Sequence, residues 1–233
     1  MDDKNKFISE RHIALREAET KADNLVKEIE RRGLIRSGIS EKDLNDKVYE
    51  LALEMYGIKK YWHKRIVRAG KNTLCPYKEN PPNLIINEDD ILFFDFGPVF
   101  EDWEADIGRI YILGNDPEKI HLKNETEKCW QIGKQHFLNT NNITGAELYA
   151  FVTALANERG FEFPQPHCGH LIGNFPHEDL QGEELENYIH PENKIKMSDP
   201  DKNGNPRDWI LEVHLVNREK QIGGFFEQLL TVE

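Results

Sequence analysis

Residues 91–113 read ILFFDFGPVFEDWEADIGRIYIL and carry the clearest strand pattern in the first half of the chain. Two apolar runs, separated by a Gly-Pro turn signal and a group of acidic residues, predict an antiparallel hairpin or meander. Asp95 follows the first run and Asp106 heads the second. A hairpin centred between Phe100 and Glu101 would set these two carboxylates opposite each other, which is destabilising unless a cation lies between them.

A second pair of acidic residues shows the same arrangement near the end of the chain. Residues 209–216 and 224–232 have the pattern of strands, and they contain Glu212 and Glu227. A turn midway between these two residues would again bring the carboxylates face to face. A single acidic residue is usually exposed to solvent. Four carboxylates in apolar strands, however, are costly to bury without a metal.

Helical patterns precede each group of strands. The predicted helices run from about Lys6 to Gly33, Ser40 to Gly57, Pro117 to Asn139 and Thr144 to Gly160. The order helix, helix, strands therefore occurs twice, in about residues 6–114 and 117–233. We expect an α/β (α+β) fold in a single domain over residues 1–233, with a curved, mostly antiparallel sheet covered on one face by four helices and two pseudo-symmetric halves.

Composition excludes several classes of protein. With 38% hydrophobic residues in 233 positions, the chain can bury a core and is not disordered. A net charge of -12 disfavours nucleic acid and anionic membranes as partners. Three cysteines without a C-x-x-C pair give neither a disulfide framework nor a zinc ribbon, and they favour a reducing compartment. Because neither an export signal nor a membrane span is predicted, we expect a cytoplasmic protein.

Candidate imidazoles lie in the segment HCGHLIGNFPHE, residues 167–178. The glycines near His170 allow close approach of the backbone to a ligand. His177, seven residues later, is a candidate hydrogen-bond donor to a substrate. Four carboxylates with one or two imidazoles form a site for divalent ions of the Mn, Fe, Co or Zn kind.

Together these motifs resemble the pita-bread metallopeptidase superfamily, family M24, which includes methionine aminopeptidases, Xaa-Pro aminopeptidases and prolidases. The resemblance extends over about residues 77–232, whereas residues 1–76 match only as helices. The motif residues are Asp95, Asp106 in Ala-Asp-Ile-Gly-Arg, His170 in Gly-His-Leu-Ile-Gly, His177 before Glu178, Glu212 and Glu227.

The resemblance implies a site for two divalent ions (Mn, Co, Zn or Fe), with manganese as one expected metal. Asp95 would chelate one ion, and His170 with Glu212 would hold the other. Asp106 and Glu227 would bridge the two ions.

The implied activity is that of a metal-dependent exopeptidase acting on a peptide or dipeptide, most similar to an Xaa-Pro aminopeptidase or dipeptidase. A metal-bound water would attack the N-terminal peptide bond. Glu212 would shuttle its proton, and His177 would stabilise the oxyanion. The oligomeric state is not implied by the resemblance, and a homodimer is one of the states to be tested.

Several positions depart from the family pattern. Tyr77 stands where relatives usually carry a substrate-contacting His, eighteen residues before Asp95. We expect its phenol to project into the cleft as a hydrogen-bond donor. His214 stands in the segment where relatives have Pro-Gly, and Phe225-Phe226 occupies the place of an Arg found in proline-specific relatives. Those relatives generally carry a separate N-terminal domain, which we do not expect here.

Three alternatives remain at this point. The first is a non-catalytic pita-bread binding protein. The second is a mononuclear iron oxygenase that would use His177, Asp179 and His214, although it leaves most of the strand carboxylates unexplained. The third is a metal-free C–N hydrolase of the creatinase type, which retention of all five ligands disfavours.

Overall fold

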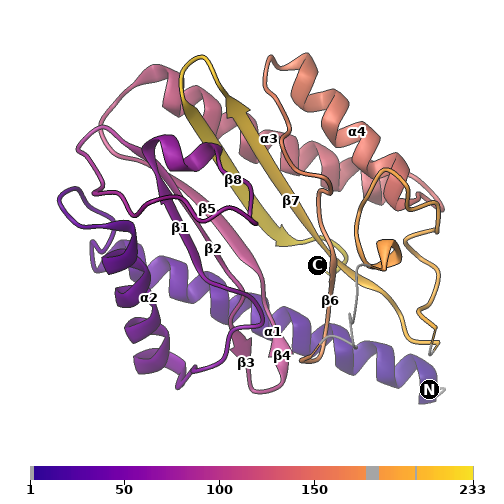
Figure 1. Cartoon of the computed structure of the whole chain (residues 1–233). Coiled ribbons are helices and arrows are strands. Elements are labelled where there is room, and N and C mark those ends of the chain that lie inside the picture. The colour runs from indigo at the N-terminus through magenta and orange to yellow at the C-terminus, as the bar shows by residue number, and fades with distance from the viewer. Residues whose placement is uncertain (1–2, 177–183, 203, 233) are drawn as a thin grey trace.

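The computed structural model describes residues 3–176, 184–202 and 204–232 (Figure 1). Two predicted site residues, His177 and Asp179, lie outside the described residues. The elements are α1 (Asp3–Arg31), α2 (Glu41–Tyr56), β1 (Ile66–Ala69), the 3-10 helix η1 (Gly70–Leu74), β2 (Ile91–Phe96), β3 (Val99–Phe100), β4 (Trp103–Glu104), β5 (Ile107–Ile112), α3 (Pro117–Asn139), α4 (Gly145–Glu158), β6 (Leu171–Ile172), the 3-10 helix η2 (Leu185–Asn187), β7 (Asp208–Asn217) and β8 (Ile222–Leu229).

One curved sheet of six strands organises the described residues, in the order β1-β2-β5-β8-β7-β6. All of its strand pairings are antiparallel. The order has a two-fold character, because three strands of the first half meet three strands of the second half at the β5–β8 pair. The predicted fold class, a curved antiparallel sheet with helices and two related halves, is confirmed.

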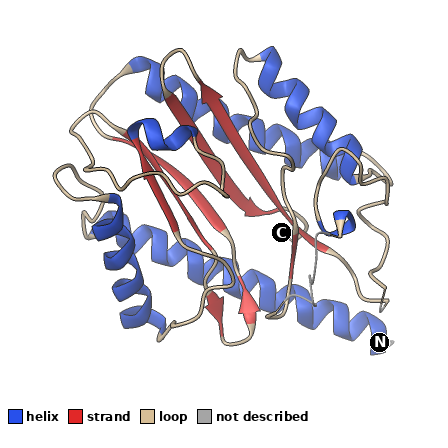
Figure 2. Ribbon diagram, in the orientation of Figure 1, coloured by secondary structure: helices blue, strands red, loops and turns tan. Residues whose placement is uncertain are grey.

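The helices pack on one face of this sheet, and α1 and α3 pass behind the strands in Figure 2. Leu92, Phe94 and Phe96 of β2 join the apolar cluster that contains the buried apolar residues of α2 and those of α1 between Ala18 and Ile29. In the second half, the backbone oxygen of Leu211 in β7 accepts a hydrogen bond from Trp130 of α3. Side chains alternate between the two faces of a strand, so the residues between these positions point away from the helices.

The helix boundaries follow the capping residues found in the sequence. The Ser40 side chain accepts a hydrogen bond from the Asp43 backbone at the start of α2, and Thr144 does the same with Glu147 at the start of α4. Each pair is a capping box, which supplies partners for backbone N–H groups left free in the first helical turn. Among the described residues, no helix combines the length and the apolar character needed to cross a membrane.

The two predicted hairpins differ in how well their registers match the structure. Glu212 lies opposite Glu227, as predicted. Asp95, in contrast, lies opposite Gly108 and not opposite Asp106, so the predicted register was wrong by two residues. The pairing of Phe100 with Trp103 centres the turn between Glu101 and Asp102, one residue later than predicted, and moving the centre of a hairpin by one residue moves its register by two.

Two further differences concern the ends of the predicted strands. The sequence pattern predicted no strand before residue 81. In the structure, β1 pairs with β2 and places Ile66 opposite Asp95. The last strand ends at Leu229, before the predicted end at Val232.

Gly108 allows the two halves of the sheet to meet closely. It lies opposite Glu227 in the β5–β8 pair. A Cβ atom at this position would lie 2.6 Å from Phe225 Cε1 and 2.9 Å from Glu227 Cβ. These separations are shorter than van der Waals contact, so any side chain here would displace Phe225 or push the strands apart.

We therefore expect Gly108→Ala to lower the free energy of unfolding by about 1–3 kcal/mol, the usual cost of overpacking a core. Gly133→Ala in α3 is the matched control, because its added Cβ would meet only terminal methyl groups of Leu211 and Val152, at 3.1 and 3.3 Å. Alanine also gains up to about 1 kcal/mol of helix propensity over glycine. Urea unfolding of both variants tests this, and equal losses of stability would contradict the assigned role of Gly108.

Candidate metal centre

A cavity of about 360 Å³ lies on the face of the sheet that points away from the helices. The register explains this placement, because Phe93, Asp95, Glu212 and Glu227 all occupy the alternate positions that do not pack against helices. All five predicted metal ligands and Tyr77 line the cavity: Asp95, Asp106, His170, Glu212, Glu227 and Tyr77. Sequence elements from both halves thus converge on one site.

Asp106 lies at the centre of this cluster. Asp106 directly precedes β5 and is only 1% exposed to solvent. Its Oδ1 lies 3.2 Å from His63 Nε2, and its Oδ2 lies 3.1 Å from His170 Nε2. The carboxylate therefore faces one imidazole on each side.

The segment before β6 fixes the orientation of His170. Its Nδ1–H donates to the backbone oxygen of Leu171 at 2.7 Å, and its own backbone oxygen accepts from Ile210 N of β7. Gly169 makes this close approach possible, since a Cβ there would lie 2.1 Å from Ile210 O and its φ is +147°. With Nδ1 engaged by the backbone, Nε2 is directed at Asp106. This is the usual arrangement of a metal-binding histidine.

His63 is a member of the cluster that sequence reasoning missed. Its side chain is 7% exposed, and its Nε2 lies 3.3 Å from Asp95 Oδ1 as well as close to Asp106. The residue belongs to the segment Trp62-His63-Lys64-Arg65, which precedes the unpredicted strand β1. No periodicity or motif in that segment distinguishes a buried histidine from a surface one.

Two groups of side chains have ligand atoms within 4.8 Å of one another. The first consists of His63, Asp95 and Asp106, and the second of Asp106, His170 and Glu227. Asp106 belongs to both groups.

Glu212 is the one predicted ligand that neither group includes. Its Oε1 lies 2.6 Å from Nδ1 of His167, a second histidine for which no role was predicted.

Burial and mutual proximity perturb the titration of these groups. Burial raises the pKa of Asp95 to about 7, although His63 acts in the opposite sense. Burial also opposes the charge on Asp106, but the adjacent His63 and His170 outweigh it and lower the pKa to about 2. For Glu227, burial and the charge of Asp106 raise the pKa well above its usual range. Perturbations of this size are typical of functional sites.

The donor set fits divalent cations. Carboxylate oxygens and imidazole nitrogens are the common protein ligands of Mn, Fe, Co and Zn. Glu227 is 2% exposed, and its Oε2 has no hydrogen-bond partner among the described residues. A buried carboxylate oxygen without a donor is costly, and a cation in the cluster would remove that cost.

His214, the third ligand of the iron oxygenase alternative, is engaged elsewhere. Its Nε2 lies 2.8 Å from the Thr73 backbone oxygen, and its Nδ1 lies 3.3 Å from Gln165 Nε2. Burial lowers its pKa to about 4, so the ring is neutral. A neutral ring that donates through one nitrogen and accepts through the other has no free nitrogen for a metal, and this disfavours the oxygenase alternative.

Tyr77 lies at the rim of the cavity. The residue is 39% exposed, and its ring centroid is 5.8 Å from that of His63. The buried Arg68 guanidinium holds this loop by donating to the backbone oxygen of Glu79 at 2.9 Å. Burial raises the pKa of the Tyr77 phenol, so it stays protonated near neutral pH.

The two phenylalanines in the place of the family's Arg point to opposite faces. Phe225 lines the cavity. Phe226 packs against Trp130 of α3, with ring centroids 5.4 Å apart.

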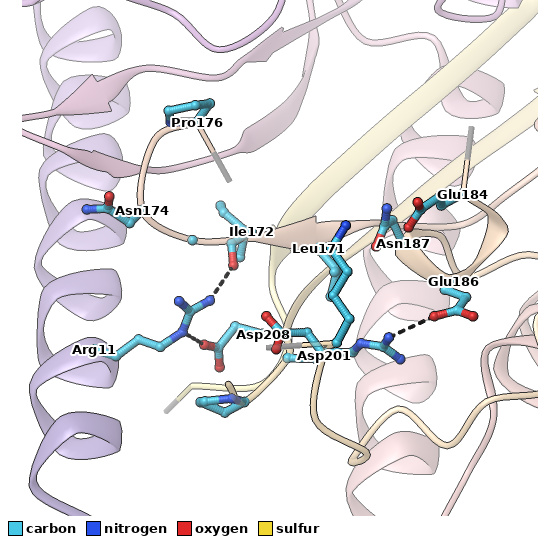
Figure 3. A pocket seen from close by; sticks show the side chains of 14 residues that line it. Arg11, Leu171, Ile172, Asn174, Pro176, Glu184, Glu186, Asn187, Asp201 and Asp208 are labelled. Carbon is cyan, nitrogen blue, oxygen red and sulfur yellow. Dashed lines mark hydrogen bonds and ion pairs between the residues drawn. The ribbon is translucent and has the colours of Figure 1, made fainter. Parts of the chain in front are cut away.

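A second cavity, of about 160 Å³, lies beside β6 and the start of β7 (Figure 3). Arg11 of α1 reaches into it, with Nε 2.5 Å from Asp208 Oδ2 and Nη2 donating to the Ile172 backbone oxygen. Arg207 pairs with Glu186 at 3.1 Å in the same cavity. None of the predicted site residues that the structure describes lines it, and these contacts connect α1 and the η2 segment to the sheet.

Comparison with family models gives one match. The model of metallopeptidase family M24 matches residues 14–202. No match was found among curated proteins.

Solved structures show the same fold at low sequence identity. A prolidase from Thermococcus sibiricus is 20% identical, with a TM-score of 0.75 over 97% of this chain and 59% of that one. An X-Pro aminopeptidase from Thermotoga maritima is 19% identical, with a TM-score of 0.69 over 98% of this chain and 62% of that one. This chain therefore spans about three fifths of the length of these two proteins. A methionine aminopeptidase from Rickettsia prowazekii is 14% identical, with a TM-score of 0.70 over 94% and 92% of the two chains.

Because Asp106 belongs to both ligand groups, Asp106→Asn should abolish the binding of at least one ion or weaken it at least about 10-fold. An amide offers one neutral oxygen in place of two charged ones. Elemental analysis and calorimetric titration with Mn²⁺ measure the effect. The matched control is Asp102→Asn in the exposed turn between β3 and β4. Unchanged metal stoichiometry and affinity in Asp106→Asn would contradict the assignment of Asp106 as a shared ligand.

Proposed function

This chain belongs to metallopeptidase family M24, and from that premise we propose that it is a metal-dependent exopeptidase that hydrolyses N-terminal peptide bonds. The observation that carries the proposal is the buried cluster centred on Asp106, in which two groups of possible ligands share one carboxylate. Such sharing is what a pair of adjacent ions requires. We propose a dinuclear centre of Mn, Co, Zn or Fe.

Asp95, Asp106, His170, Glu212 and Glu227 are the proposed ligands. Divalent ions held by these residues would supply a bound water with a pKa of about 7 and would polarise the scissile carbonyl. The cavity walls exclude bulk water from the carboxylates, which strengthens their interactions with a cation.

Glu212 is proposed to take the proton of the attacking water and to return it to the leaving amine. Its position supports this role, because it lines the same cavity as the other proposed ligands and lies opposite Glu227. His167 Nδ1, 2.6 Å from Glu212 Oε1, can orient that carboxylate. His177, outside the described residues, is proposed to donate a hydrogen bond to the carbonyl oxygen as negative charge develops there.

The proposed substrates are Xaa-Pro peptides or dipeptides. The choice is motivated by the prolidase and the X-Pro aminopeptidase among the similar structures, and Met-initiated peptides are the alternative to be compared, because a methionine aminopeptidase has the same fold. The three free thiols, Cys75, Cys129 and Cys168, are compatible with a reducing compartment such as the cytoplasm. Homodimerisation is part of the proposal as well, to be tested by light scattering.

A panel of peptides tests the activity. The metal-free protein is reconstituted with Mn, Co, Zn or Fe, its metal content is measured, and it is assayed on Xaa-Pro dipeptides, Xaa-Pro tripeptides and Met-initiated peptides. We expect cleavage of the Xaa-Pro set with at least one metal, loss of cleavage with a chelator and recovery on adding the metal back. Asp106→Asn should be inactive under all these conditions.

A non-catalytic pita-bread binding protein is the second candidate, and Tyr77 in place of the usual histidine favours it. Saturable binding of an Xaa-Pro peptide by the fully metal-loaded protein, without cleavage, would support that candidate and overturn the peptidase.

The substitution at Tyr77 gives a separate expectation about rate. A phenol can donate a hydrogen bond but carries no positive charge at neutral pH, so it contributes more to binding than to proton transfer. Tyr77→Phe should therefore lower kcat less than His177→Ala, which removes a transition-state donor worth about 2.7–4 kcal/mol at comparable sites. Steady-state kinetics on a cleaved dipeptide decides the ranking, and equal losses in kcat would make Tyr77 a principal donor.

A further inference from the structure

We propose that His63 is a direct ligand of the ion held by Asp95 and Asp106, so that each ion of the proposed centre is bound by one imidazole. The inference rests on the proposed metal centre and adds a ligand that the family pattern does not contain. It assigns a role to a buried histidine that no sequence motif marked.

The His63 ring is buried within contact distance of two carboxylates. His63 Nε2 lies 3.3 Å from Asp95 Oδ1 and 3.2 Å from Asp106 Oδ1, and the side chain is 7% exposed. The three ligand atoms lie within 4.8 Å of one another, as do those of the group around His170. An ion that contacts both carboxylates is therefore within reach of this nitrogen.

The Nδ1 nitrogen of His63 is hydrogen-bonded to the backbone, as is that of His170. His63 Nδ1–H donates to the backbone oxygen of Lys64 at 2.7 Å, and His170 Nδ1–H donates to that of Leu171 at the same distance. In both residues the acceptor belongs to the next residue in the chain. Engaging Nδ1 in this way fixes the ring and leaves Nε2 as the metal-facing nitrogen, the arrangement typical of histidine ligands.

His63 and His170 occupy related positions relative to the sheet. It lies shortly before β1, and His170 directly precedes β6. These two strands form the opposite edges of the six-stranded sheet. The two imidazoles therefore approach Asp106 from related positions in the two halves of the fold.

The backbone around His63 is built to hold it there. Trp62 N donates to Gly97 O at 2.9 Å, and Val99 N donates to Lys60 O at 3.1 Å. Gly97 leaves the space for the ring, since a Cβ there would lie 2.3 Å from His63 Cδ2. The segment is thus fastened beside Asp95 by main-chain bonds, and rotation of the side chain away from the cluster is restricted.

A nitrogen ligand changes what the site prefers to bind. Carboxylates alone suit Mg²⁺ and Mn²⁺, whereas imidazole favours Zn²⁺, Fe²⁺ and later transition metals. The Asp95 and Asp106 site should accordingly bind Co²⁺ or Zn²⁺ more tightly relative to Mn²⁺ than the same site does after His63→Gln.

Metal binding by the full-length protein tests this ligand independently of activity. Wild type, His63→Gln and His170→Gln are titrated with Co²⁺ by calorimetry, and bound metal is counted by elemental analysis. His214→Gln is the matched control, because His214 is a buried imidazole of the same cavity that belongs to neither ligand group. We expect His63→Gln to lose one ion or to bind it at least about 10-fold more weakly, His170→Gln to affect the other ion, and His214→Gln to retain both.

X-ray absorption spectroscopy of the wild-type protein gives a second measurement that needs no variant to fold. Scattering from imidazole rings should correspond to about one ring per bound ion, with nitrogen at about 2.0–2.1 Å in the zinc form. About one ring for every two ions, or unchanged stoichiometry and affinity in His63→Gln, would overturn the ligand assignment while leaving the metal centre intact. A wild-type protein that binds no ion would overturn the proposed metal centre itself.

Discussion

Acidic side chains buried in an otherwise apolar sheet impose the main energetic requirement of this fold. Asp95, Asp106 and Glu227 are each no more than 7% exposed, and desolvation raises the free energy of their charged forms. Two imidazoles, His63 and His170, face them and offset part of that cost. The remaining excess of carboxylates over cationic groups is what a divalent ion in the proposed centre would neutralise. The same strands keep helices on the opposite face, so the polar cluster does not interrupt the main cores.

Much of this arrangement could be predicted from the sequence because it depends on local rules. Alternation along β7 and β8, and a turn midway between Glu212 and Glu227, were enough to pair those residues correctly. The predicted register of the first hairpin was wrong by two residues because its turn is centred between Glu101 and Asp102, one residue later than the midpoint between the two aspartates. The assumption that Asp95 and Asp106 must be direct partners was also too strict. Diagonal neighbours on one face of a sheet are close enough to act together.

The part of the site formed by residues before 77 could not be predicted, because its structure depends on distant partners. β1 is short and contains Arg68, so its pattern lacks a clear alternation. It forms a strand because β2 offers a free edge, and that pairing brings the segment with His63 to Asp95. His167 shows the same limitation, since its contact with Glu212 arises from the path of the loop before β6. In both cases the sequence shows that a histidine is present, but only the tertiary structure determines which carboxylate it contacts.

The meeting of β5 and β8 also determines when the centre can form during folding. Arg109 of β5 donates to the Glu227 backbone oxygen across 118 positions of the chain, and a single pair of residues defines the register of these strands. Each half can build its helices and outer strands from nearer contacts, but closing so long a loop carries a large entropic cost and is typically slow. The proposed ligands of the two ions come from both halves, so a complete site for metal would exist only after the halves have docked.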